Sequence, residues 1–83
     1  MIKRYRTMPV EKEALQYTGD NGETVKHFAG DKVRKYEGKI LQVITKQGWS
    51  HLNPNDYLIK NPDGEFYPCN PRTFNNTYEE VGG

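Results

Sequence analysis

Few side chains in this sequence could act as nucleophiles, bases or metal ligands near neutral pH. The candidates are His27, His51 and Cys69, and no two of them have the short spacing that zinc ligands use in pairs. Ser50 directly precedes His51, so in a strand the two side chains point to opposite faces and cannot pair as nucleophile and base. Cys69 lacks a catalytic signature and is expected to be a partly buried structural thiol. We therefore expect a protein that is not an enzyme, with no metal and no cofactor.

The carboxylates closest to a paired acid-base arrangement are Asp56, Asp63 and Glu65. Asp63 belongs to a turn by composition, and Asp56 is expected to accept hydrogen bonds from backbone N–H groups of its own turn. Both glycine-rich motifs that cradle phosphates are missing from the sequence. Binding by surface side chains is therefore a better hypothesis than catalysis.

Aromatic side chains make up 12% of the sequence and crowd its second half. Exposed aromatic rings beside cations are typical of protein interfaces and of base-stacking surfaces. The expected interaction residues combine aromatic anchors with cations that would steer a partner: Arg4, Arg6, Lys32, Arg34, Lys35, Trp49, Tyr57 and Tyr67.

Charge is distributed unevenly along the chain, although its net charge is only +1. Residues 26–46 carry six basic and two acidic side chains, whereas residues 47–83 carry two basic and five acidic ones. A dedicated duplex-binding protein would be more basic, because neutralised phosphates supply most of its affinity. A nucleotide or another small anion, and single-stranded nucleic acid, stay open as alternative ligands.

The length of 83 residues, with 34% hydrophobic side chains, suits one small domain. A domain of this size has a small core, so self-association into a homo-oligomer could complete it. The sequence has no apolar run long enough to cross a membrane and no apolar stretch typical of a signal peptide. An intracellular protein without a membrane partner is expected.

The turn residues of the sequence divide it into short elements. A helix is expected after the break at 19–22, with Asp20 and Glu23 at the spacing of a capping box and Gly30 at its end. Asn61-Pro62-Asp63-Gly64 has the composition of a type I turn and predicts a hairpin. Asn70 followed by Pro71 predicts one further helical turn. The expected strands are 2–8, 10–17, 33–36, 39–45, 49–52, 57–60, 65–68 and 78–81.

This order of elements predicts an α+β fold over residues 1–81. One short helix would pack on a curved, mostly antiparallel sheet. A β-grasp fold is the alternative, because that fold also begins with two strands, a helix and a further strand. Gly82 and Gly83 are expected to form a flexible tail.

Motifs spread over nearly the whole chain resemble a family of small proteins from tailed phages and prophages. The central turn of that family often has the sequence Pro-Gly-Asp-Tyr, and here it is Pro54-Asn55-Asp56-Tyr57. Asn is the commonest residue other than Gly at positive φ, so the turn is expected to persist. The other matching segments are 1–6, 9–11, 13–14, 16–19, 64–69, Phe74 and 77–81.

The resemblance implies the cytoplasm of a phage-infected bacterium as the setting, but it implies no activity and no functional residues. With the small size and the aromatic content, it predicts an accessory protein that binds and modulates a host factor, such as a component of host defence. A homo-oligomeric binder of a nucleotide or small anion is the first alternative. A binder of single-stranded nucleic acid is the second.

Overall fold

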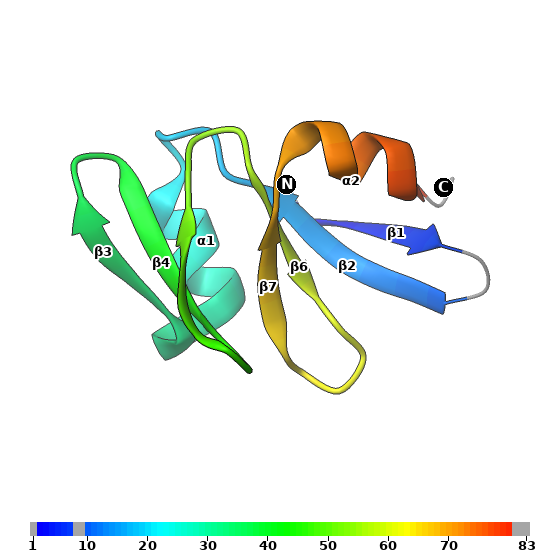
Figure 1. The fold of residues 1–83 in the computed structure, drawn as a ribbon, viewed down its shortest axis with the longest axis horizontal. Coiled ribbons are helices and arrows are strands. Elements are labelled where there is room, and N and C mark those ends of the chain that lie inside the picture. The colour runs from blue at the N-terminus through cyan, green and yellow to red at the C-terminus, as the bar shows by residue number, and fades with distance from the viewer. Residues whose placement is uncertain (1, 8–9, 81–83) are drawn as a thin grey trace.

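A computed structural model describes residues 2–7 and 10–80 (Figure 1). The tail predicted at 82–83 lies outside these residues. No helix in the described part of the chain is long and apolar enough to cross a membrane. In chain order the elements are β1 (Lys3–Thr7), β2 (Val10–Gln16), α1 (Gly22–Ala29), the 3-10 helix η1 (Gly30–Lys32), β3 (Val33–Glu37), β4 (Ile40–Thr45), β5 (Gly48–Leu52), β6 (Tyr57–Lys60), β7 (Phe66–Cys69), α2 (Pro71–Thr77) and β8 (Glu79–Glu80).

The strands form two sheets rather than the single sheet expected from the sequence. The larger sheet has the order β7-β6-β2-β1-β8, and the smaller one has the order β3-β4-β5. Every strand pairing among the described residues is antiparallel, which confirms that part of the prediction. The β-grasp alternative does not fit, because the strand that follows α1 belongs to a different sheet from β1 and β2.

A shared apolar core explains why the strands divide into two sheets. Leu15 and Leu58 of the larger sheet, Val43 and Leu52 of the smaller sheet, and Val25 of α1 are all at most 1% exposed and belong to one cluster. Two sheets and a helix can enclose these side chains, whereas one sheet under one helix would leave part of them in water. Figure 1 shows α1 beside the smaller sheet.

A second cluster lies on the opposite face of the larger sheet, under α2. Ala14 and Ile59 of that sheet are buried there together with Phe74 of α2, and the half-buried rings of Tyr5 and Tyr57 pack against them. The prediction of one helix was therefore wrong, because α2 extends over 71–77 and covers this face. Figure 1 shows α2 next to β1 and β2.

Two of the three helix ends that local sequence signals predicted are confirmed. Asn70 caps α2 by accepting a hydrogen bond from the backbone N–H of Thr73, and Pro71 is its first residue, as predicted. Gly30 ends α1 with a φ of 63°. The capping box predicted at Asp20 was wrong: Asn21 occupies the N-cap, and its side chain bonds backward to the backbone of 16–18.

Both turns predicted in the second half of the chain are confirmed. Gly64 N–H donates to the carbonyl of Asn61 at 2.9 Å, which closes the turn between β6 and β7. Asn55 has a φ of 79°, the positive value that its place in the central turn requires. Asp56 accepts a hydrogen bond from Asn53 N–H with its carboxylate, so Asp56 stabilises its own turn.

Candidate interaction surface

The outer face of the smaller sheet carries an unusual group of exposed side chains. Antiparallel register places Arg34 of β3 opposite Gln42 of β4, and Gln42 opposite His51 of β5. Residues directly opposite one another project from the same face of a sheet. The other face packs on α1 and the main core. We use the name outer face for the side chains of Arg34, Tyr36, Gln42, Ile44, Trp49 and His51.

Arg34 and Trp49 form the centre of this outer face. The guanidinium carbon of Arg34 lies 3.8 Å from the centroid of the indole ring of Trp49, which is a cation–π contact. Nε of Arg34 also donates a 2.9 Å hydrogen bond to Oε1 of Gln42, whose side chain is buried. The stack and the hydrogen bond together hold the guanidinium in one orientation.

Tyr36 and His51 make a second aromatic contact on the outer face. Their ring centroids lie 4.6 Å apart with an interplanar angle of 70°. Tyr36 is 52% exposed and Trp49 is 40% exposed, values that place both among the exposed large hydrophobic side chains of the described chain. Neither Tyr36 nor His51 was expected from the sequence to take part in binding. Alternation along β3 and β5 would have indicated them only once the strand register was known.

Three lysines of the basic segment 26–46 are engaged with neighbouring groups. Nζ of Lys32 donates to a backbone carbonyl of the β6–β7 turn at 3.2 Å. Lys39 and Lys46 form ion pairs with Asp20 and Asp63 at 3.2 and 3.8 Å. Lys35 is exposed, but the alternation of side chains along β3 points it to the opposite face from its neighbour Arg34. Among the described residues of this segment, Lys39 and Lys46 are the cations paired with a carboxylate, whereas Lys32 keeps its charge.

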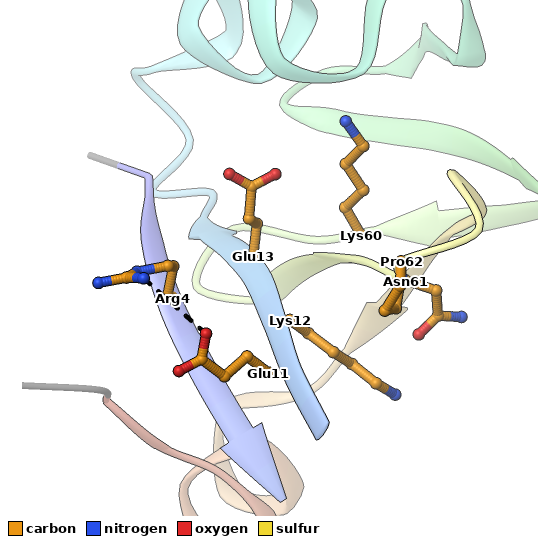
Figure 2. Close-up of a pocket in the computed structure, with 7 residues that line it drawn as sticks. All are labelled: Arg4, Glu11, Lys12, Glu13, Lys60, Asn61 and Pro62. Carbon is orange, nitrogen blue, oxygen red and sulfur yellow. Dashed lines mark ion pairs between the residues drawn. The ribbon is translucent and has the colours of Figure 1, made fainter. Parts of the chain in front are cut away.

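The predicted cations of β1 lie in a different part of the molecule. Arg4 belongs to an open depression of about 320 Å³ on the larger sheet (Figure 2). Nη1 of Arg4 lies 3.8 Å from a carboxylate oxygen of Glu11, and the depression also contains Glu13 and Lys60. Lys12 also lines the depression, so three cations and two carboxylates are mixed there and no uniform field of one sign results. The side chain of Arg6 lies outside the described part of the structure.

Two aromatic side chains expected at an interface belong to the second core. Tyr57 stacks on Phe74 with a centroid distance of 3.7 Å and an interplanar angle of 8°. Tyr67 shares a 2.7 Å hydrogen bond between hydroxyl groups with Tyr78, and Nζ of Lys12 donates to Tyr67 at 3.0 Å. Both tyrosines are half-buried, so of the three predicted aromatic anchors only Trp49 lies on an exposed surface.

The polar cluster of Lys12, Tyr67 and Tyr78 alters proton affinities. Burial lowers the pKa of Lys12, but hydrogen bonds to the two tyrosine hydroxyls outweigh burial and leave the pKa raised. Burial and the hydrogen bond shared with Tyr67 raise the pKa of Tyr78, against the opposing effect of Lys12. The cluster therefore holds its protons firmly at neutral pH, which suits a structural role.

The candidate metal ligands and the thiol are spread over the described structure. Within residues 2–7 and 10–80, no group of three or more His, Cys, Asp or Glu side chains could hold a metal ion. Cys69 is a half-buried free thiol, and burial, followed by the negative charge of Asp56, raises its pKa. A raised pKa leaves less thiolate at neutral pH and weakens Cys69 as a nucleophile.

Comparison with protein-family models, with curated proteins and with solved structures finds no match for the chain. The resemblance to small phage proteins therefore stays a prediction.

Proposed function

We propose that this chain is a non-enzymatic accessory protein of a phage or prophage that binds and modulates a host protein in the bacterial cytoplasm. The observation that carries the proposal is the outer face of the smaller sheet, where Arg34 stacks on exposed Trp49 beside exposed Tyr36. Trp, Tyr and Arg are the residue types that contribute most binding energy at protein interfaces.

The position of these side chains on a sheet favours binding. The main core supports the strands from beneath, since Val43 and Leu52 are fully buried directly under the outer face. Binding to side chains already held in place loses less conformational entropy than binding to flexible ones. A partner would therefore meet a surface that needs little rearrangement.

The distribution of charge favours a protein over single-stranded nucleic acid. Affinity for nucleic acid rises with the number of phosphates that lysine and arginine side chains neutralise. Lys39 and Lys46 are already paired with carboxylates, and Lys32 is bonded to a carbonyl. Arg34 is therefore the main cation that the outer face offers to a ligand.

Affinity capture from a bacterial lysate tests the proposal when single variants of the bait are compared. We expect Trp49→Ala and Tyr36→Ala to retain less than about one tenth of the host protein captured by the wild type, because truncation of a hot-spot residue costs about 2 kcal/mol or more. Arg72→Ala is the matched control, since Arg72 is exposed on α2 away from the outer face. Circular dichroism checks that each variant is folded. Equal capture by Trp49→Ala and the wild type would refute the proposal.

A further inference from the structure

The guanidinium of Arg34 is only partly used by the protein itself. Its plane is held against Trp49 at 3.8 Å, and its Nε donor is taken by Gln42 at 2.9 Å. A guanidinium has five N–H donors, so the four on its two terminal nitrogens remain. Among residues 2–7 and 10–80, no carboxylate pairs with Arg34.

This geometry selects one mode of ligand binding. A carboxylate can bind a guanidinium side-on, through Nε and one terminal nitrogen, or end-on, through both terminal nitrogens. The hydrogen bond to Gln42 occupies Nε and therefore disfavours the side-on mode. Stacking on the indole removes water from one side of the guanidinium, which strengthens its interaction with an anion at the open edge.

We infer that the partner presents an aspartate or glutamate side chain that binds end-on to the terminal nitrogens of Arg34, with an apolar or aromatic neighbour packed on Tyr36 and His51. The inference rests on the proposed function and names the chemistry of the partner. Charge complementarity carries it: Arg34 is an oriented cation that no carboxylate of the described residues pairs with, and the acidic Glu37, opposite Ile40, lies beyond the bulge at the end of β3. One carboxylate matches that cation, whereas a nucleic-acid strand needs several.

The bulge and the charged side chains of β3 favour a partner that contacts the face of the smaller sheet and does not pair with its edge. β3 is an edge strand, and such strands can pair with a strand of another protein. Its register shifts between Lys35 and Glu37, which is a bulge, and both side chains are exposed and charged. Bulges and charged side chains disfavour pairing at a sheet edge. The partner is therefore expected to contact the side chains of the outer face.

Titration followed by tryptophan fluorescence tests the inference, because Trp49 is the one tryptophan of the sequence. The probes are a short peptide of glutamate and phenylalanine with blocked ends, the same peptide with glutamine in place of glutamate, and oligothymidylate of equal charge. We expect the acidic peptide to bind at least about tenfold more tightly than the glutamine peptide, because charge-assisted bidentate bonds are lost with the charge. Oligothymidylate should bind more weakly than the acidic peptide.

Three variants test whether the affinity for the acidic peptide depends on the planar guanidinium of Arg34 or only on positive charge. Arg34→Gln should weaken binding of the acidic peptide by about tenfold or more, and Arg34→Lys should not restore it, because lysine lacks the planar fork. Lys35→Gln removes the same charge from the neighbouring residue, which points to the other face, and should change affinity by less than about twofold. All variants are compared after a check of their thermal unfolding.

The outcomes distinguish the inference from the proposed function. Equal affinity for the glutamate and glutamine peptides, equal effects of Arg34→Gln and Lys35→Gln, or tighter binding of oligothymidylate would overturn the inference. If Trp49→Ala loses the host protein while Arg34→Gln retains it, the proposed function stands and the inference falls. If Trp49→Ala still captures the host protein, the proposed function itself falls.

Discussion

Truncation of Phe74 to alanine tests whether α2 covers the larger sheet. The side chain of Phe74 is 1% exposed and lies at the centre of the second core. Its ring stacks on Tyr57 at 3.7 Å and on Tyr78 at 4.9 Å, and it meets Tyr5 edge-on at 4.7 Å. Removing the ring would therefore leave a cavity and end three aromatic contacts at once.

The expected loss of stability is large for a domain of this size. Replacing a buried Phe by Ala costs about 3–5 kcal/mol, through lost burial and the cavity left behind. The free energy of unfolding of a chain of this length is about 4–12 kcal/mol. Since about 1 kcal/mol corresponds to about 4–8 °C in such domains, the Tm should fall by at least about 12 °C.

Thermal and urea unfolding followed by circular dichroism measure this effect. Arg72→Ala is the control, because Arg72 is exposed on the same helix and its loss should change the Tm little. If Phe74→Ala is unfolded at room temperature, Phe74→Leu replaces it in the test. Leucine retains part of the apolar volume, so the Tm of Phe74→Leu should lie below that of the wild type but above that of Phe74→Ala. A Tm shift below about 4 °C for Phe74→Ala would refute the position of α2 over the sheet.

Three further outcomes are expected. Asn55→Ala should lower the free energy of unfolding in urea by about 1 kcal/mol, because alanine disfavours positive φ, whereas Asn55→Gly should not lower it. Folding raises the pKa of both Lys12 and Tyr78, so their stabilising effect is present below the ordinary values of 10.5 and 10.0 and is lost as pH rises through the folded-state values. The free energy of unfolding in urea, measured at stepwise higher pH, should show this loss. The loss should be smaller in Lys12→Met, and an equal loss in that variant would contradict the hydrogen bonds between Lys12 and the two tyrosines. Cys69 should react with iodoacetamide more slowly in the folded protein than in urea, because its pKa is raised and its thiol is half-buried; equal rates would contradict this.

Turns and helix ends were predictable from the sequence because the interactions that fix them span only a few residues. Asn70 caps α2 by bonding a residue three positions ahead, and Gly64 closes its turn onto Asn61. The same local signals gave a wrong prediction where two neighbouring residues could both cap a helix. Asp20 and Asn21 are both good cap residues, and contacts with the end of β2 decided in favour of Asn21.

The candidate site itself was only partly predictable. Arg34 and Trp49 were both expected to bind a partner, but their contact joins residues far apart in sequence and depends on the register of β3, β4 and β5. Tyr57 and Tyr67 have the same residue type as Tyr36, so composition could not tell the buried rings from the exposed one. Their positions follow from α2, which covers one face of the larger sheet.

Local signals in the sequence therefore predict most of the strands, the hairpin at 61–64 and the absence of the usual catalytic spacings. Tertiary structure decided how the strands divide between two sheets, which aromatic rings are buried, and which cations are neutralised by neighbours. The physical reason is that burial and charge pairing depend on contacts between distant segments, such as Lys39 with Asp20 and Lys46 with Asp63. The exposed stack of Arg34 on Trp49 likewise depends on the pairing of β3, β4 and β5.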